Sequence, residues 1–215
     1  PDIALTAVCD IDSKKNKGFK DNFGCDLPVF ENYSDMHRAG LVDAVLIATP
    51  HYNHPEIAID AFESGLHVLV EKPAGVYTKQ VAKMNEAAKK SGKVFGIMFC
   101  MRTDPVFKKV RDIVKSGELG AIKRFSWTVT TWYRPQKYHD LSTWRSTWKD
   151  EGGGLLINQC PHNLDLLQWI LGMPTKIHSF VKFGKYYDIE VEDEVTAFME
   201  FENGATGTFV ASTGE

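Results

Sequence analysis

Three polar residues occur at helical spacing within an otherwise apolar stretch in the second half of the chain. Asn158 and His162 are four residues apart and Asp165 follows three residues later, so a helix would place all three on one face. Three consecutive glycines at 152–154 would let the backbone approach a ligand closely. A histidine near its ordinary pKa can act as a general base. The alternative is a satisfied core histidine, with Asp165 as a partner at the helix surface or the edge of the core.

A charged pair follows the apolar run His67–Val70. This β-branched run is typical of an interior parallel strand, and Pro73 ends it because proline cannot donate a hydrogen bond to a strand ladder. In open α/β sheets, ligands bind at the carboxyl ends of the strands. Glu71 and Lys72 are therefore positioned either for chemistry or as a surface ion pair at a strand exit, and the pattern favours neither interpretation.

Two other strand ends carry residues that suit a nucleotide. Asp10 ends the first apolar run, where an acidic residue can accept hydrogen bonds from the ribose hydroxyls of NAD. The turn at 49–54 offers backbone N–H groups and short polar side chains at the end of a second run. Taken alone, this turn is better explained by the ordinary turn preferences of proline and asparagine.

The chain contains no G-x-G-x-x-G sequence, which is the pyrophosphate-binding fingerprint of dinucleotide domains. The sequence opens with Pro1–Asp2, and a strand-like run begins at Ile3. We therefore expect that the first strand of the domain and its glycine turn lie outside this sequence. In the Rossmann strand order that first strand separates the second from the fourth, so 3–8 and 44–48 should not pair directly.

The composition argues against several classes of protein. The 215 residues are 43% hydrophobic and 25% charged, which is the balance of a globular protein with a sizeable core. A net charge of −3 without a lysine–arginine stripe argues against nucleic-acid binding, and no apolar run approaches the length of a membrane span. The four cysteines are far apart and form no metal-type cluster, as in reduced cytoplasmic proteins. We expect a cytoplasmic protein without a bound metal.

The elements that must position these residues change in character near Gly120. Before this point, short apolar runs alternate with amphipathic stretches, which predicts a doubly wound parallel sheet. The predicted strands are 3–9, 43–49, 67–70 and 94–99. We predict a truncated Rossmann-type domain with a parallel sheet over residues 1–120, in which the strand ends carry the nucleotide-binding residues.

The second half of the chain predicts a different architecture. Residues 121–133 alternate between polar and apolar, as in a half-exposed antiparallel strand. One helix is predicted over Leu155–Leu171, ended by Gly172, and Asn203–Gly204 predicts a hairpin between two further strands. We therefore predict an α+β domain over residues 121–215 with an open, mostly antiparallel sheet.

Three motifs, in the order found here, resemble the Gfo/Idh/MocA family, which includes glucose–fructose oxidoreductase and inositol dehydrogenase. They are A-T-P-x-x-x-H at 48–54, E-K-P at 71–73 and G-G-G-x-x-x-N-x-x-x-H-x-x-D at 152–165, so the resemblance covers nearly the whole chain. It implies a pyridine-nucleotide enzyme that oxidises a secondary hydroxyl of a sugar, sugar derivative or inositol, or runs the reverse reduction. It also implies that Lys72 and His162 face the reacting carbon.

The resemblance implies NAD or NADP as the cofactor, and the residues favour NAD. Asp10 is followed by Ile11, and no arginine is nearby to hold the 2′-phosphate of NADP. The expected cofactor-binding residues are Asp10, Thr49, Pro50, His51, Asn53, Glu71, Lys72 and Pro73.

Position 158 departs from the commonest family pattern, which has an aspartate four residues before the histidine. A neutral amide can orient the imidazole or the substrate, but it cannot stabilise an imidazolium by charge. If the amide merely replaces a carboxylate, Asn158→Asp should keep activity and shift the pH profile. Aromatic and arginine side chains in the loop 132–148 suit a polyhydroxylated ring, by stacking and bidentate hydrogen bonds. The expected substrate-binding residues are Arg134, Tyr138, Trp144, Arg145, Asn158 and His162.

Two other functions are compatible with the resemblance. An NAD-dependent glycosidase of the same fold uses the cofactor transiently, and a net-redox assay separates it from a dehydrogenase. A non-catalytic regulator would sense a ligand; Lys72 and His162 argue against it, whereas Asn158 and the absent glycine fingerprint argue slightly for it. The resemblance also implies a homo-oligomer, a dimer or tetramer, formed through the sheet of the second domain.

Overall fold

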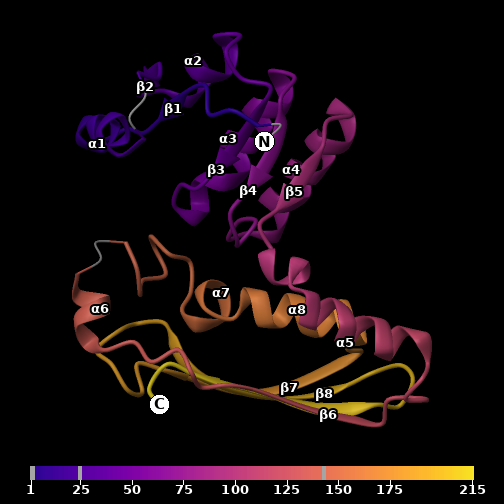
Figure 1. Cartoon of the computed structure of the whole chain (residues 1–215). Coiled ribbons are helices and arrows are strands. Elements are labelled where there is room, and N and C mark those ends of the chain that lie inside the picture. Colours follow the sequence, from indigo (N-terminus) through magenta and orange to yellow (C-terminus); the bar gives the residue numbers. More distant parts are fainter. Residues whose placement is uncertain (1–2, 24–25, 142–143) are drawn as a thin grey trace. The chain divides into compact units, whose positions relative to one another are not determined.

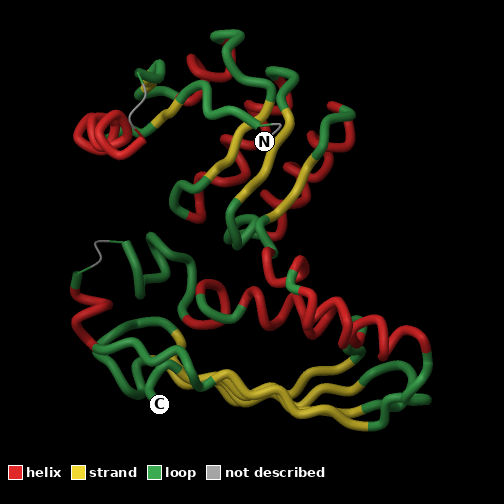
Figure 2. Tube along the Cα trace, in the orientation of Figure 1, coloured by secondary structure: helices red, strands yellow, loops and turns green. Residues whose placement is uncertain are grey.

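The computed structural model describes residues 3–23, 26–141 and 144–215. The chain divides between Met98 and Phe99 into two compact units, each with its own core (Figure 1). The first unit is built on parallel strands, and the second contains one mixed sheet with helices (Figure 2). The predicted succession of a Rossmann-type domain and an α+β domain is confirmed. Within the described ranges, no helix is both long enough and apolar enough to cross a membrane.

The division between the units comes earlier in the sequence than the boundary predicted near Gly120. Helix α5 (Pro105–Ser116) belongs to the second unit, where it packs on helix α8 (Pro161–Leu171). The guanidinium of Arg111 lies 4.7 Å from the centre of the Trp169 ring, so a cation–π contact attaches α5 to α8. When a helix is the last element of an alternating β–α pattern, its sequence does not indicate on which unit the helix packs.

The first unit contains two parallel sheets. Strands β1 (Val8–Cys9) and β2 (Val29–Phe30) form one sheet, and strands β3 (Ala44–Ile47), β4 (His67–Val70) and β5 (Phe95–Ile97) form the other in this order. In the described residues β1 pairs with β2 and belongs to a different sheet from β3. The prediction that these two segments are not direct neighbours is confirmed.

The core of the first unit lies between the larger sheet and two helices. The helices of this unit are α1 (Ser13–Phe23), α2 (Tyr33–Arg38), the 3-10 turn η1 (His51–Asn53), α3 (His54–Glu63) and α4 (Thr78–Ser91). Val68 and Val70 of β4 pack in one cluster with Phe62 of α3 and Met84 of α4. Leu69 points to the opposite face and is exposed, so β4 is buried on one face and not, as predicted, on both.

The second unit is built on a four-stranded sheet in the order β6-β9-β8-β7. The strands are β6 (Arg124–Val129), β7 (Lys176–Phe183), β8 (Glu192–Glu200) and β9 (Thr206–Ser212). Strands β7, β8 and β9 are antiparallel neighbours, which confirms the mostly antiparallel sheet. The predicted hairpin turn is also confirmed, because Gly204 has a φ of 80° between β8 and β9.

Strand β6 runs parallel to β9, so the prediction of an antiparallel strand over 121–133 is wrong. Its alternating residues show that one face is buried: Val129 packs in the core, while Arg124, Ser126 and Thr128 are exposed. Alternation reports burial and carries no information on strand direction. The long connection between β6 and β9 allows the chain to return in either direction.

The predicted single helix over 155–171 is two helices, α7 (Leu155–Asn158) and α8. Pro161 has no N–H to continue the helical ladder, and the N–H of Cys160 already bonds back to the carbonyl of Leu155. The apolar periodicity concealed this break. Two other short helices of the unit are the 3-10 turn η2 (Cys100–Thr103) and α6 (Gln136–Asp140).

Candidate active site

The carboxyl ends of β3 and β4 are connected through a buried histidine. His54 is 1% exposed, and each of its ring nitrogens lies 2.7 Å from a backbone carbonyl oxygen, Nδ1 from that of Pro73 and Nε2 from that of Thr49. Because α3 begins at His54, the imidazole lies between the two strand ends. The turn after β3 and the turn after β4 are therefore held at a fixed distance from each other.

The turn after β3 places its predicted cofactor residues in different surroundings. Thr49 and Pro50 are exposed at the strand end. His51 is buried, and the Asn53 side chain donates a hydrogen bond to Glu56 at 3.0 Å. Thr49 and Pro50 are therefore the exposed residues of this turn. His51 packs in the interior, and Asn53 contacts the first turn of α3.

The turn after β4 carries the charged pair. Glu71 and Lys72 are both half-buried, and the carboxylate of Glu71 accepts a hydrogen bond from the backbone N–H of Lys72 at 3.2 Å. The backbone N–H of Glu71 donates to the carbonyl of Ile47 on β3 at 2.8 Å. Pro73 follows as a buried residue. The pair thus sits directly where the strand ladder ends, at the edge where Rossmann-type sheets bind ligands.

Asp10 follows β1, and its side chain is 25% exposed. Its carboxylate accepts a hydrogen bond from the N–H of Asp12 at 2.9 Å, and the ammonium of Lys15 lies 3.4 Å away. The Asn16 side chain donates to the Asp10 carbonyl at 2.8 Å, which fixes this turn. A carboxylate oxygen accepts more than one hydrogen bond, so this half-buried group retains capacity for the ribose hydroxyls of NAD. The residues present fit an adenine dinucleotide.

In the second unit, His162 lies in the first turn of α8 and is half-buried. Its ring meets that of Phe99 edge to face, with the ring centres 6.1 Å apart. Asp165 is buried and accepts two hydrogen bonds from the guanidinium of Arg102, at 2.7 and 2.6 Å. Asp165 therefore has a structural partner at the edge of the core, as the alternative interpretation of the sequence proposed.

Asn158, at the end of α7, contacts a buried carboxylate. Its amide nitrogen donates a hydrogen bond to Glu151, which is 3% exposed. The second carboxylate oxygen of Glu151 accepts from the N–H of Ser146 at 2.5 Å. Burial raises the pKa of Glu151, while the hydrogen bonds from Ser146 and Asn158 and the charge of Arg145 act in the opposite direction.

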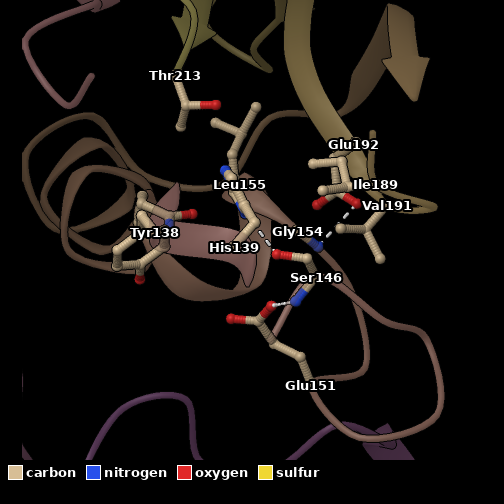
Figure 3. A pocket seen from close by; sticks show the side chains of 11 residues that line it. Tyr138, His139, Ser146, Glu151, Gly154, Leu155, Ile189, Val191, Glu192 and Thr213 are labelled. Carbon is tan, nitrogen blue, oxygen red and sulfur yellow. Dashed lines mark hydrogen bonds between the residues drawn. The ribbon is translucent and has the colours of Figure 1, made fainter. Parts of the chain in front are cut away.

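Ser146 and Glu151 line a small pocket beside the first residue of β8. Figure 3 shows His139, Ser146 and Glu151 connected in a row, with Nδ1 of His139 2.5 Å from the Ser146 hydroxyl oxygen. Burial lowers the pKa of His139. The free space in this pocket is about 10 Å³, which is enough for about one water molecule and not for a sugar ring.

The predicted arginine and aromatic residues form one cluster. The guanidinium groups of Arg134 and Arg145 lie 5.1 and 5.0 Å from the centre of the Tyr138 ring. Arg145 also lies 4.9 Å from the Trp144 ring, and Arg134 lies 5.3 Å from that of Trp132. The structure thus brings together four of the six residues predicted to bind the substrate.

The predicted catalytic residues are divided between the two units. Lys72 belongs to the first unit, whereas Asn158 and His162 belong to the second. The approach of Lys72 and His162 to one reacting carbon therefore stays a prediction.

Sequence reasoning does not identify two residues that hold these groups in place, Arg102 and Glu151. It includes His54 in a motif, but it does not predict that the imidazole bridges two turns. An acidic residue directly before three glycines, and an arginine three residues after a predicted strand, are signals that could have drawn attention. Their partners could not be inferred, because Arg102 and Asp165 are 63 residues apart in the chain.

The start of α7 depends on a glycine. The N–H groups of Gly154 and Leu156 donate to the buried carboxylate of Glu192 at 2.9 and 3.0 Å. A Cβ at position 154 would lie 2.1 Å from the backbone carbonyl oxygen of Glu192. Because a backbone atom cannot move aside cheaply, Gly154→Ala should destabilise the protein by about 2–3 kcal/mol. Urea unfolding measures this.

Gly18→Ala is the matched control, since a Cβ there meets no atom within 4 Å. In helix α1 this change should be neutral or slightly stabilising. Equal unfolding midpoints for Gly154→Ala and the unaltered protein would show that β8 accommodates the methyl group.

Comparison with families of known proteins gives matches over both units. Residues 1–99 match the model of an oxidoreductase family with an NAD-binding Rossmann fold, and residues 107–215 match the model of the GFO/IDH/MocA C-terminal domain.

Individual relatives are dehydrogenases. The chain is 30% identical over 220 residues to D-glucoside 3-dehydrogenase of Escherichia coli. The aligned region covers 94% of this chain and 61% of the relative. It is 30% identical over 172 residues to inositol 2-dehydrogenase of Rubrobacter xylanophilus, covering 80% of this chain and 46% of the relative. The chain thus spans between 46% and 61% of the length of these relatives.

Solved structures agree with the fold. The WlbA dehydrogenase of Bordetella pertussis, crystallised with NADH and UDP-GlcNAcA, superposes with a TM-score of 0.90 at 29% identity. The superposition covers 97% of this chain and 64% of that one. The similarity therefore extends over both units.

Proposed function

The chain belongs to the GFO/IDH/MocA family of NAD-binding oxidoreductases, and we propose that it acts on a secondary hydroxyl of a sugar, sugar derivative or inositol. The proposed reaction is transfer of a hydride between that carbon and NAD. The observation that carries the proposal is the position of two residues: Lys72 stands at the carboxyl end of β4, and His162 stands at the start of α8. The dehydrogenase relatives support it.

The protein side of the proposed reaction uses these two residues. The ammonium of Lys72 would stabilise the negative charge that develops on the hydroxyl oxygen as its carbon is oxidised. The imidazole of His162 would take the hydroxyl proton as a general base. Asn158 would hold the substrate or the imidazole through its amide. NAD, when bound, supplies the hydride acceptor.

Cofactor binding is proposed at the strand ends of the first unit. Asp10 would bind the adenosine ribose, because its half-buried carboxylate stands at the end of β1 and can accept further hydrogen bonds. The exposed Thr49–Pro50 segment and the Glu71–Pro73 turn, which His54 connects, would contact the nicotinamide half. Asp10 without a nearby arginine in the sequence favours NAD over NADP.

Substrate binding is proposed at the arginine and aromatic cluster. Aromatic faces stack on sugar rings, and the planar guanidinium groups of Arg134 and Arg145 suit paired hydroxyls or a carboxylate. The WlbA relative was crystallised with the acidic sugar nucleotide UDP-GlcNAcA, which supports an acidic sugar among the substrates to be tested.

Reduction of NAD by the full-length protein with a panel of neutral sugars, sugar acids and inositols tests this function. NADH formed in proportion to oxidised substrate is the expected result. Release of a glycosidic leaving group without net NADH would identify the glycosidase instead. Tight ligand binding with neither reaction would identify the regulator.

We also propose that the protein forms a homo-oligomer through the outer face of the second sheet. Phe180 on β7 is 78% exposed, and Phe198 on β8 is exposed on the same face, since β7 and β8 pair with Phe180 opposite Thr196 and His178 opposite Phe198. Exposed aromatic side chains on a sheet face are typical of a covered interface.

Phe180→Asp should dissociate this oligomer, because a carboxylate buried against a second apolar face lacks a partner. Sedimentation velocity at several protein concentrations measures the change. Lys109→Asp, which introduces the same carboxylate at an exposed residue of α5 and not on this sheet face, serves as the control and should keep the oligomer. A monomer for the unaltered protein at every concentration would contradict the proposal.

A further inference from the structure

Glu151 is a buried carboxylate that the proposed reaction does not use directly. One of its oxygens accepts from the backbone N–H of Ser146, and the other accepts from the amide of Asn158. An ionised carboxylate only accepts hydrogen bonds, so the atom of Asn158 that faces it must be the NH₂ group. The carbonyl oxygen of the Asn158 side chain then points to the other side. The orientation of this amide is therefore determined by Glu151.

The backbone that holds Glu151 in place is unusual. Ser146 has a φ of 65°, and it is the one non-glycine residue with a positive φ in the part of the chain that the structure describes. Such a conformation costs about 1–3 kcal/mol and persists only where the surroundings enforce it. Here its N–H binds Glu151 and its hydroxyl binds His139. The strained turn thus aims a backbone donor at the carboxylate.

Charged and titratable groups face Glu151 from several elements. Arg145 lies on the same loop and favours the ionised carboxylate, whereas Glu192 at the start of β8 disfavours it. His139 of α6 lies beside Ser146, and burial favours its neutral form. The hydrogen bonds from the Ser146 N–H and from the Asn158 amide therefore both go to Glu151.

We propose that Glu151 is a positioning residue that fixes the amide of Asn158 for the substrate or for His162. The inference rests on the proposed function, because the role of Asn158 in the reaction is part of that proposal. Glu151 itself touches neither substrate nor cofactor in this account. Its contribution is made through the orientation of one amide.

The contact changes what is expected of Asn158→Asp. A carboxylate at position 158 would face the carboxylate of Glu151 at hydrogen-bond distance, and two such groups cannot both ionise without a large cost. From the sequence alone, this variant stays active if the amide merely replaces a carboxylate. With Glu151 as its neighbour, we expect Asn158→Asp to be less stable and less active than the unaltered protein.

Exchanging the carboxylate at position 151 with the amide at position 158 distinguishes a positioning role of Glu151 from a role in packing alone. The double variant Glu151→Gln with Asn158→Asp again pairs one amide with one carboxylate, now with the donor on residue 151. We expect Glu151→Gln alone to lower kcat about 10- to 100-fold with a smaller change in KM. We expect the double variant to regain at least about tenfold over Asn158→Asp. Glu202→Gln, an exposed carboxylate-to-amide change, is the control.

An NMR measurement tests the contact between Glu151 and Asn158 even if no substrate is found. In the unaltered protein, the side-chain amide NMR signals of Asn158 should shift as pH passes through the raised pKa of Glu151. This shift should be absent in Glu151→Gln. Activity then tests the consequence: kcat and its pH profile unchanged in Glu151→Gln, or a double variant no better than Asn158→Asp, would overturn the proposal. A protein with the NMR shift but without dehydrogenase activity would refute the proposed function and retain the contact.

Discussion

Replacing His162 with alanine should lower turnover about 10²- to 10⁴-fold and leave NAD affinity nearly unchanged. The factor is the usual loss when a positioned general base is removed. The effect should be confined to catalysis because His162 is half-buried at the start of α8 and its ring packs edge to face on Phe99 of the same unit. Steady-state kinetics with the best substrate of the panel, together with calorimetric titration of NAD, measures both quantities.

Two variants sharpen this prediction. Gln168→Ala changes an exposed residue of the same helix and should behave like the unaltered protein. Lys72→Ala should reduce both turnover and NAD affinity, since Lys72 lies at the strand end proposed to bind the cofactor. Near-normal turnover in His162→Ala would remove His162 from the mechanism, whatever the result for Lys72.

Replacing Arg102 with alanine should destabilise the second unit by about 3 kcal/mol. The change leaves the carboxylate of Asp165, whose side chain is only 7% exposed, without the two hydrogen bonds that Arg102 donates. Breaking a buried pair by removing one partner costs about 3–5 kcal/mol, and the 39% exposure of Arg102 places this pair at the low end. Urea unfolding with a probe in the second unit measures the loss.

Arg111→Ala is the matched control for this prediction. The guanidinium groups of Arg102 and Arg111 both lie over the Trp169 ring, at 5.5 and 4.7 Å, but in the described structure only Arg102 bonds to Asp165. Removal of the Arg111 side chain should cost about 0.5–1 kcal/mol. The double variant Arg102→Ala with Asp165→Asn should recover part of the loss, because no charge is then buried alone. Equal losses for the Arg102 and Arg111 single variants would mean that stacking, and not the ion pair, holds this segment on α8.

A change of pH should affect Glu151 in a defined direction. Its pKa is raised in the folded protein, so between the ordinary value for glutamate and the raised value the folded state binds more protons than the unfolded state. The contribution of Glu151 to stability is therefore fully present below its ordinary pKa and is lost as pH rises through the raised one. Glu151→Gln should gain stability relative to the unaltered protein over that window, and unfolding curves at several pH values check this.

Much of the fold could be predicted because local signals agreed with the final structure. The run His67–Val70 with a following proline predicted β4 and its end, and Asn203–Gly204 predicted the β8–β9 turn. Pro161 was equally visible, but the apolar periodicity around it concealed the break between α7 and α8. The direction of β6 has no local signal at all, since alternation depends only on which face is buried.

The candidate site was predicted in its chemical groups and not in its supporting contacts. Lys72, Asn158 and His162 stand out by residue type and spacing. Arg102 and Glu151 stand out only once their partners are known. The contact between Glu151 and Asn158 also depends on the strained backbone of Ser146, which no propensity scale predicts.

The parallel pairing of β6 with β9 affects the order in which the second unit can assemble. A tight turn joins β8 to β9, whereas Ser126 on β6 and Thr208 on β9 are 82 residues apart. Closing a long loop costs more conformational entropy, and distant contacts slow folding. We therefore expect the β7–β8–β9 meander to form first and β6 to dock last, so amide hydrogens of β6 should exchange through lower-energy openings than those of β8. Helices α7 and α8 lie inside that loop, so Asn158 and His162 would reach their final places only when the first strand of the unit closes the sheet.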